Sequence, residues 1–513
     1  MSHFSAQLQP GRGLGFLALG ASLHDILTRL KAEPQRFPKI DILYDPKSPV
    51  TEPVCIYLPL NGIRLRFDGP EQRLRLIEVV DFNKSHITFN DKDLVRPLNG
   101  TTAAAPTNTS DGSLGPTFRH IYHRLLGPTY AGEYLPPTNG QQDGIYVLSY
   151  PGVAFNFSLP ASAYSPDKDV VSLLSSSSSQ TATSMAIFSG VSWAESRNTL
   201  WTEILPSVKL TSIVPRSKDV APDEISLIRI QGGGKLELFR KWTNNAFVIK
   251  LGETSPQDLI RELGPPSAIY RKNDQKMVIH KLRTASHTRS RPSAGELGRP
   301  DDLTDTDHSS MNTGSDDSDN EAAVEEFARN PSGECFYNYF FLGFDVLLST
   351  PVPVSPTPPG QAGQEEIVPS DIKNHSPDRL VATKLVIHGN VPGSYEFNRH
   401  RRCRWEIGCL PEKPEEGPAN SELLFKDVEV RMNEKWASSR PGQGAQPRQR
   451  GMVLNRGWGD SPGSSCELLG GWEESGARRA EANGDSTTTT LYGFPGMVFE
   501  VLKNGYVNTL TVF

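Results

Sequence analysis

Residues 248–280, VIKLGETSPQDLIRELGPPSAIYRKNDQKMVIH, contain the signals that decide the fold class. The stretch opens as a strand, and a short helix then begins at Thr254 or Ser255, because either hydroxyl can accept a hydrogen bond from a free amide of the first turn. Pro256 suits the first helical position, where its missing N–H has no intrahelical partner. Gly264 and the two prolines after it end the helix. The pattern predicts a strand, a short helix and then further strands.

The same design recurs nearer the start of the chain. With one inserted residue, the segment 14–30 matches the helix of the opening stretch: Ser22, Asp25, Ile26, Leu27 and Leu30 correspond to Ser255, Asp258, Leu259, Ile260 and Leu263. In the opening stretch itself, residues 268–270 and 277–280 follow the helix and form a predicted hairpin. Recurrence of this kind indicates a structural building block rather than a catalytic centre.

Four predicted hairpins share a glycine between a strand and a second strand with alternating apolar residues. The glycines are Gly62, Gly152, Gly343 and Gly496, and a turn that needs a positive φ accounts for all of them. We therefore predict an α+β fold of repeated modules, each a short helix packed on an antiparallel β-meander, interrupted by long disordered insertions. The expected divisions are a first module at 11–98, a polar loop at 99–115, a second module at 116–240, a third module at 241–409 with insertions at about 283–330 and 351–379, a low-complexity insertion at 410–486, and a C-terminal hairpin at 487–513 that completes a sheet.

Composition limits the function classes. The hydrophobic fraction of 36% is low, and 44 glycines and 41 prolines are abundant, as expected for ordered modules separated by unfolded segments. A net charge of −6 disfavours a nucleic-acid partner, which usually calls for a basic excess. The first residues lack the layout of a signal peptide, and the apolar run 335–348 is too short to span a bilayer. Five scattered cysteines fit reduced thiols, so we expect a cytoplasmic protein.

Motifs for catalysis or cofactors are weak. The glycine-rich segment 11–20 follows no strand and contains no Gly-x-Gly-x-x-Gly, and 232–235 lacks the Ser or Thr of a phosphate-binding loop. Cys403 and Cys409 have no second metal-ligand pair, so no zinc site is expected. Cys403 lies among arginines that would lower its thiol pKa, but no catalytic partner accompanies it, and a small buried or interface thiol is favoured. We expect no cofactor, no metal and no enzymatic activity.

The densest basic segment is 399–404. Arg399, Arg401 and Arg404, together with Arg402, alternate with His400 and precede Trp405. One interpretation is a solvated strand face whose alternate members pack. The other is a patch that binds an anionic lipid headgroup or an acidic partner.

Two tetrapeptides have the aromatic-x-x-aliphatic form of segments that add a strand to ubiquitin-like autophagy modifiers. They are WTEI at 201–204 and FKDV at 425–428. FKDV falls in the predicted low-complexity segment and is therefore expected to be the more accessible one. Trp201 is as readily interpreted as a core residue.

Two segments carry a family resemblance: FYNYFFLGFDVL (336–347) and LVIHGNVPGSYEFNRHRRCRWEI (385–407) closely resemble the phagophore assembly factor family. The matching motif positions include Gly343, Asp345, His388, Asn390, Pro392, Gly393, Phe397, Asn398, Arg402 and Cys403. Segments of the first module, 276–280 and 187–190 also resemble that family, so the resemblance covers the structured parts of roughly the whole chain. The long insertions depart from the family's animal pattern.

Membership of this family implies a non-enzymatic scaffold or regulator of autophagy. Such proteins act at the phagophore assembly site in complex with a large β-propeller protein, to which phosphoinositide binding is mainly attributed. The alternative is a peripheral Golgi or vesicle-trafficking adaptor that binds anionic lipid through the basic segment 399–404. Ser315 and Ser318 lie among acidic residues in the insertion and are predicted phosphorylation sites.

Overall fold

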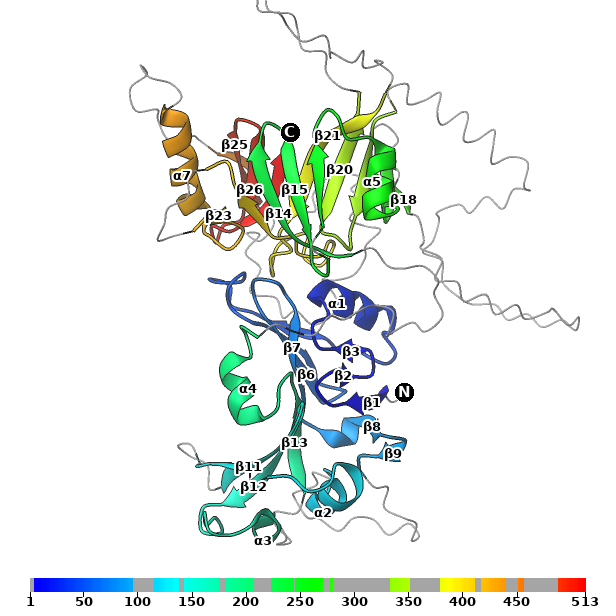
Figure 1. The fold of residues 1–513 in the computed structure, drawn as a ribbon, viewed down its shortest axis with the longest axis vertical. Helices are drawn as coiled ribbons and strands as arrows, with labels where there is room; N and C mark the ends of the chain where they lie inside the picture. Colours follow the sequence, from blue (N-terminus) through cyan, green and yellow to red (C-terminus); the bar gives the residue numbers. More distant parts are fainter. Residues whose placement is uncertain are drawn as a thin grey trace, which may run out of the picture.

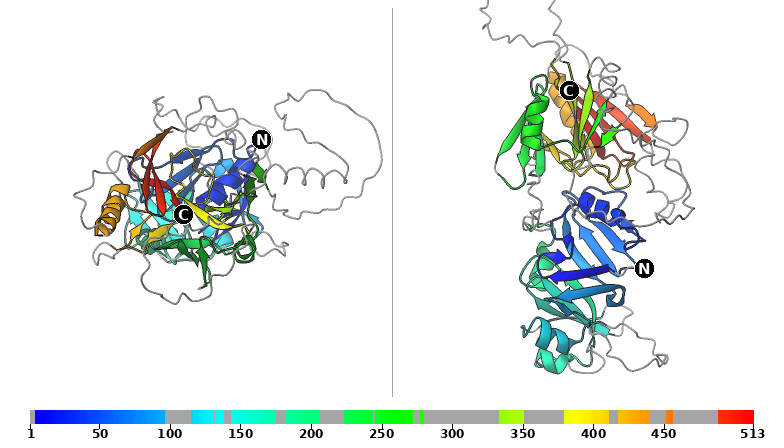
Figure 2. Two further views of the ribbon diagram at one scale, coloured as in Figure 1. Left: turned by 90° about the horizontal axis from the view of Figure 1, so that it is seen from above. Right: turned by 90° about the vertical axis from the view of Figure 1, so that its right-hand side faces the viewer.

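The computed structural model describes residues 4–95, 115–130, 132–137, 143–174, 181–203, 205, 223–243, 245–271, 277–279, 333–350, 379–410, 417–438, 451–455 and 488–513. Almost all of the expected polar loop 99–115, the insertions at 283–330 and 351–379, and both Ser315 and Ser318 lie outside these ranges. The described part is an α+β structure dominated by antiparallel sheets, as the sequence predicts. It forms two bodies stacked end to end, which we call the N-terminal half (residues 4–203) and the C-terminal half (residues 223–513) (Figures 1 and 2).

The N-terminal half contains one small and one large sheet. The small sheet has the order β3 (Leu17–Ala18), β2 (Gly13–Leu14), β1 (Phe4–Gln9), β8 (Ser85–Phe89), β9 (Lys92–Asp93). The large sheet has the order β10 (Glu133–Leu135), β11 (Asp143–Tyr150), β12 (Val153–Pro160), β13 (Ala182–Ile187), β7 (Leu74–Val79), β6 (Ile63–Phe67), β5 (Val54–Leu58), β4 (Asp41–Leu43). The helices are α1 (Leu23–Ala32), the 3-10 turn η1 (Phe82–Lys84), α2 (Phe118–His120), the π-turn η2 (Ile121–Leu125), α3 (Val170–Leu174) and α4 (Trp193–Thr199).

The C-terminal half again has a small and a large sheet. The small sheet has the order β16 (Ala246–Lys250), β15 (Lys235–Arg240), β14 (Ile225–Gly232), β22 (Trp405–Ile407), β23 (Ala419–Asn420). The large sheet has the order β18 (Met277–Ile279), β17 (Ala268–Arg271), β19 (Cys335–Tyr339), β20 (Phe344–Ser349), β21 (Val381–His388), β27 (Val507–Val512), β26 (Met497–Val501), β25 (Thr488–Phe494), β24 (Met452–Asn455). The helices that can be described are α5 (Pro256–Leu263) and α7 (Phe425–Ser438).

The two halves have similar strand orders, except that the large sheet of the C-terminal half has the additional edge strand β18. Each small sheet has one parallel pair at its centre, β1 with β8 and β14 with β22. Each large sheet joins two antiparallel meanders through one pair, β7 with β13 and β21 with β27. In each half a capped helix, α1 or α5, follows the first three strands of the small sheet. The topology of the N-terminal half therefore reappears in the C-terminal half.

The helix of the opening stretch forms as its sequence predicts. Ser255 caps α5 and shares a reciprocal capping box with Asp258, Pro256 occupies the first turn, and Gly264 ends the helix at φ 80°. In α1 the Ser22 hydroxyl accepts a hydrogen bond from the Asp25 amide at 3.1 Å. Both helices turn their leucines into the core of their own half. The four hairpin glycines have φ between 66° and 87°, which confirms the positive-φ explanation.

The sheets group the strands differently from the three expected modules. Strands β14 and β15 were expected at the end of the second module, but they pair with β16 and β22 of the C-terminal half. The low-complexity assignment of 410–486 was wrong for β23, α7 and β24, because Phe425, Val428 and Met432 recur at helical spacing and are buried. The C-terminal segment does complete a sheet, through the pairing of β27 with β21.

Within the described residues, none of the helices combines the length and apolar character needed to cross a bilayer.

Candidate functional site

The family-like motif forms a strap between the two halves. We define the strap as residues 388–404, which connect the end of β21 to β22. Its side chains contact both bodies: Phe397 packs against the core of the N-terminal half, and Val391 shares a small cluster with Val50 and Tyr506. The strap therefore lies where the halves meet.

Asparagines shape the strap. Asn390 and Asn398 adopt left-handed backbone conformations, with φ of 45° and 65°, which asparagine tolerates better than most residues. The Asn390 side-chain oxygen accepts a hydrogen bond from the Asn398 amide at 2.6 Å, and its side-chain nitrogen donates to Gln72 of the N-terminal half at 2.8 Å. One side chain thus closes the strap on itself and ties it to the other half.

Arginines of the strap reach several carbonyls and carboxylates. Arg402 is buried and donates to the carbonyl oxygens of Pro70, at 2.7 Å, and of Gly389, at 2.7 Å. Arg401 is buried and donates to Glu224 at 2.6 Å, with Asp25 at 3.4 Å. The charge and hydrogen-bonding capacity of both guanidinium groups is directed inward, which is how buried charges are accommodated.

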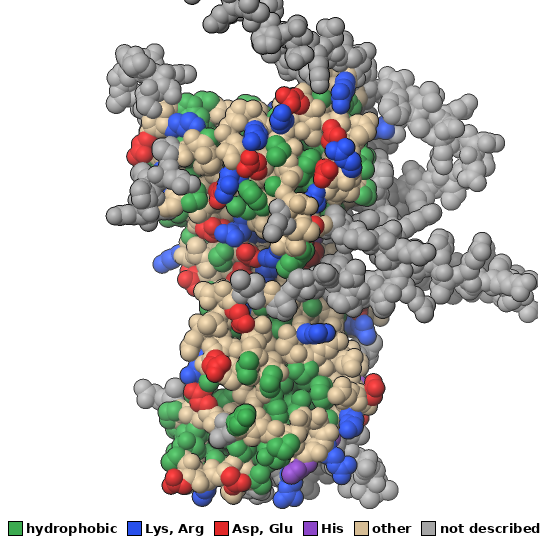
Figure 3. Space-filling model, viewed as in Figure 1, with side chains coloured by type: hydrophobic (Ala, Val, Ile, Leu, Met, Phe, Trp, Pro, Cys, Tyr) green, Lys and Arg blue, Asp and Glu red, His purple; other side chains and the backbone are tan. Residues whose placement is uncertain are grey.

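The remaining arginines of the expected basic patch are also paired. Arg404 donates to Glu422 at 2.8 Å and lies 3.4 Å from Glu71, and Arg399 lies 3.4 Å from Glu396. The interpretation of 399–404 as a solvated face or lipid patch was therefore wrong for the buried Arg401 and Arg402. Arg401 pairs with Glu224 and Asp25, and Arg402 donates to backbone carbonyls. On the face shown in Figure 3, basic and acidic side chains are interspersed over the C-terminal half.

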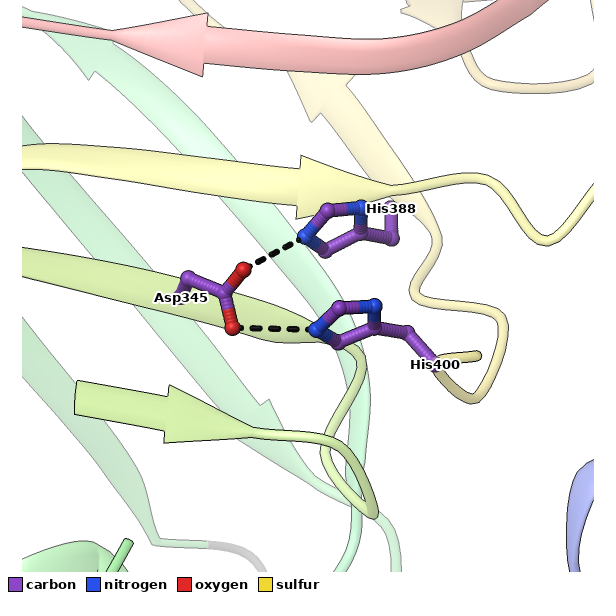
Figure 4. A group of neighbouring side chains, drawn as sticks. All are labelled: Asp345, His388 and His400. Carbon is purple, nitrogen blue, oxygen red and sulfur yellow. Dashed lines mark hydrogen bonds and ion pairs between the residues drawn. The ribbon is translucent and has the colours of Figure 1, made fainter. Parts of the chain in front are cut away.

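Three buried side chains form the polar centre of this region. Asp345 on β20 accepts hydrogen bonds through its two carboxylate oxygens, one from Nε2 of His388 at 2.9 Å and one from Nε2 of His400 at 3.0 Å (Figure 4). The two imidazole rings stack with centroids 3.7 Å apart and planes 9° apart. The cluster joins the end of β21 to the middle of the strap.

Burial and charge set the protonation of this cluster. Although burial opposes it, the pKa of Asp345 is lowered well below its ordinary value, because both histidines donate to the carboxylate. Burial lowers the pKa of His400 to about 4 in spite of Asp345. Near neutral pH, His400 is therefore neutral and carries its proton on Nε2, facing an ionised Asp345.

The same residue types could bind a metal ion, and Asp345, His388 and His400 are close enough to be considered as ligands. A histidine nitrogen binds a metal through a lone pair in its ring plane, however, and two nearly parallel stacked rings hold these lone pairs in separate, nearly parallel planes. The rings would have to tilt strongly to share one ion. In the arrangement observed, the cluster acts as a hydrogen-bond clamp on the strap.

Small residues of the motif allow close packing. A Cβ on Gly343 would lie 2.4 Å from the Arg401 carbonyl oxygen, and one on Gly393 would lie 2.2 Å from the Tyr44 hydroxyl. Pro392 is buried next to Val391. Only glycine fits where the strap crosses the β19–β20 turn and where it meets Tyr44 of the N-terminal half.

Cys403 is fully buried, as the structural interpretation of this thiol requires. The expected lowering of its pKa was wrong, because burial raises the pKa to about 12 and outweighs the neighbouring arginines. The thiol is therefore protonated and a poor nucleophile.

The two tetrapeptides differ in exposure. Phe425 and Val428 lie in α7 and are buried, so the expected accessibility of FKDV as an extended segment was wrong. Trp201 is 37% exposed just after α4, while Ile204 lies outside the described residues.

The strap's partners were missing from the sequence interpretation. Gln72, Glu71, Asp25 and Glu224 contact strap residues from more than 170 positions away, and no local pattern marks them. The one signal in the sequence is the high proportion of polar residues in 388–404, which indicates hydrogen-bond partners elsewhere in the chain.

Comparison with known proteins gives a consistent family. A family model described as phagosome assembly factor 1 matches residues 13–295 and 371–513. The chain is 23% identical to PHAF1 protein At3g51130 of Arabidopsis thaliana, over 99% of this chain and 92% of that protein. It is 21% identical to PHAF1 protein CG7083 of Drosophila melanogaster, over 92% and 85% of the two chains, and 23% identical to PHAF1 protein T01G9.2 of Caenorhabditis elegans, over 76% and 73%. No solved structure matches the chain. Because the family model covers most of its residues, the chain belongs to the phagosome assembly factor 1 family.

Proposed function

We propose that this protein is a non-enzymatic scaffold in autophagy, which is recruited from the cytoplasm to the forming phagosome and acts there in complex with a β-propeller protein. The name of its family supports a role in phagosome assembly. The observation that carries the scaffold proposal is the use of the motif residues: their polar groups hold the two halves together. Asn390 binds Gln72 and Arg402 binds Pro70, and Arg401, next to the motif residue Arg402, binds Asp25.

A junction of this kind supports a scaffold in which the surfaces of the N-terminal and C-terminal halves keep a fixed orientation relative to each other. Buried ion pairs and side-chain hydrogen bonds contribute to the specificity of an arrangement, because a wrong arrangement would leave more of these groups without partners. We further propose that the matched strand orders reflect two copies of one helix-and-meander unit. A platform of this kind presents two similar but non-identical faces to its partners.

Complementation in cells that lack the gene tests this proposal. The full chain with a fluorescent tag should restore autophagic flux and gather at sites of phagosome formation during starvation. A β-propeller protein should be enriched when the tagged chain is purified from these cells. Restoration of flux without recruitment and without such a partner would contradict the scaffold role.

Variants of two hairpin turns separate the junction from general stability. Gly343→Ala disturbs the contact with the strap. Gly496→Ala affects a turn where, among the described residues, the added Cβ comes within 4 Å of the Phe513 carbonyl oxygen alone, at 3.4 Å. Partner enrichment should fall for the first variant and persist for the second. Equal enrichment for both, at equal expression, would show that the junction is not needed.

The Golgi adaptor alternative required direct lipid binding by the basic segment. Arg401 and Arg402 are only 5% and 6% exposed and are engaged inside the protein. The geometry therefore favours the scaffold.

A further inference from the structure

Among the described residues, a helix covers the outer face of the large sheet in the N-terminal half, and no helix covers the equivalent face in the C-terminal half. In the N-terminal half, α4 lies across the sheet on the side opposite α1 and the small sheet (Figure 1). Beneath it Leu76, Val147, Ala154 and Ala186 are each less than 9% exposed, and they pack with Phe188 and Leu200. This helix completes a second, smaller core.

Strand registers identify the same positions in the C-terminal half. Ala154 lies two residues after the turn glycine Gly152 and pairs with Ala186. Val498 lies two residues after Gly496 and pairs with Thr511. Val147 of β11 pairs with Asn156, four residues after Gly152, and Leu491 of β25 pairs with Glu500, four residues after Gly496. Val147 therefore corresponds to Leu491.

These equivalent residues line a groove. A hollow of about 260 Å³ is bordered by Leu491, Val498 and Thr511, with Leu454 of β24 and Val386 of β21. All five residues are half-buried, and none of the residues that line the hollow belongs to a described helix. In the described structure, the face that α4 covers in one half is therefore accessible in the other.

We propose that this groove binds an amphipathic helix of a partner protein, in the way that α4 binds the N-terminal half. The helix α4 shows what fits. Trp193, the buried Ser196 and Leu200, which directly follows the helix, are spaced i, i+3 and i+7 on the side that faces the sheet, as in helix-in-groove recognition. The Trp193 amide donates to Ser149 at 2.8 Å, and Arg197 pairs with Glu133 at 2.8 Å.

The acidic side chains in the wall of the groove already have partners within the chain. Glu396 lies 3.4 Å from Arg399, and the buried Glu500 accepts a hydrogen bond from the Thr489 hydroxyl at 2.8 Å. The occupant is therefore a helix with two apolar anchors about two turns apart, and it needs no charged side chain between them. The volume is smaller than the roughly 300–1,000 Å³ typical of small-molecule sites, which also favours side chains as the occupants.

A peptide derived from α4 tests the groove on the full-length chain. The probe is a fluorescein-labelled peptide with the sequence of residues 190–203 and the changes Glu195→Gln and Glu203→Gln, so that Arg197 is its one charged side chain. We expect saturable binding by fluorescence anisotropy, with little dependence on salt because the contacts are apolar. A second peptide that also carries Trp193→Ala and Leu200→Ala should bind about tenfold more weakly or not at all, a difference of about 1.4 kcal/mol.

Matched protein variants locate the binding. Val498→Lys places a long cationic side chain in the groove and should weaken the probe about tenfold or more. Val430→Lys makes the same change at a 54% exposed position on α7 and should leave binding unchanged. Equal binding to both variants, or no saturable binding to the wild-type chain, would overturn the proposal. Thermal unfolding of each variant verifies that the chain remains folded.

Photo-crosslinking identifies competing occupants. A benzophenone amino acid at position 511 should crosslink to the probe, and the same amino acid at position 186, beneath α4, should not. Crosslinks from position 511 to another part of the same chain, or to a second copy, with exclusion of the probe, would show that the groove serves the chain itself and would refute the partner helix. The groove proposal goes beyond the autophagy role, because its failure would leave the complementation result unchanged.

Discussion

Gln72 and Asn390 exchange two hydrogen bonds across the junction of the two halves, although they lie 318 positions apart in the chain. The Gln72 side-chain nitrogen donates to the Asn390 carbonyl oxygen at 2.8 Å, and the Asn390 side-chain nitrogen donates to the Gln72 side-chain oxygen at 2.8 Å. Both residues have a positive φ, 52° and 45°. The pair shows how tightly the strap is fitted to the N-terminal half.

A double-mutant cycle on this pair should reveal coupling. Gln72→Gly and Asn390→Gly remove the side chains without adding strain at a positive φ, and each leaves a buried partner unsatisfied, at a cost of about 1–3 kcal/mol. The double variant should cost less than the sum of the singles by about 0.5 kcal/mol or more. Urea unfolding measures the three free energies, and strict additivity would contradict direct coupling across the junction.

Gly343→Ala should destabilise the protein more than Gly496→Ala. Both glycines end equivalent hairpin turns with a positive φ, 87° and 76°, so both variants carry a similar backbone cost of about 1 kcal/mol. An added Cβ at 343 would also meet the Arg401 carbonyl oxygen at 2.4 Å and the Cys403 Cβ at 2.8 Å. We expect Gly343→Ala to lower the free energy of unfolding by about 3 kcal/mol in total, since overpacking adds about 1–3 kcal/mol. Similar melting temperatures for the two variants would show that the strap can move aside.

His400 should make stability depend on pH. Burial lowers its folded pKa to about 4, while the unfolded pKa is near 6.5, so the unfolded chain binds more protons between these values. The contribution of neutral His400 is therefore fully present above pH 6.5 and is progressively lost as the pH falls toward 4, by an amount on the order of 3 kcal/mol.

The variant His400→Gln keeps a donor for Asp345 and does not titrate. Its free energy of unfolding should fall less steeply than that of the wild type between pH 6.5 and 4. The difference between the two pH profiles isolates His400 from other groups. Parallel profiles would show that His400 is not held neutral by burial.

Cys403 should resist alkylation in the folded protein. Its thiol is buried, and its pKa of about 12 leaves almost no thiolate at pH 8. Iodoacetamide labelling followed by mass spectrometry should modify Cys403 only after urea is added. Labelling of the native protein at the rate of the denatured protein would reopen the interpretation of Cys403 as a nucleophile.

Local signals in the sequence determined the helix starts and the tight turns. Ser22, Ser255, Pro256 and Gly264 act through contacts with residues three or four positions away, so their roles can be inferred from neighbours alone. The turn glycines are equally local, since a positive φ is a property of one residue. The sequence alone also indicated the family through the motif at 388–403.

Only the tertiary structure decided what surrounds the polar motif. The sequence predicted that Arg401 and Arg402 belong to a solvated basic segment. In the structure both are buried, and they donate hydrogen bonds to Glu224 and to the Pro70 carbonyl oxygen, respectively. Likewise, the sequence predicted that FKDV is accessible, whereas in the structure it lies in α7 and Phe425 and Val428 pack in the core of the C-terminal half. Burial and charge pairing depend on residues that the fold brings together from both halves. The separation of two residues along the sequence does not tell whether they will lie close together in the structure.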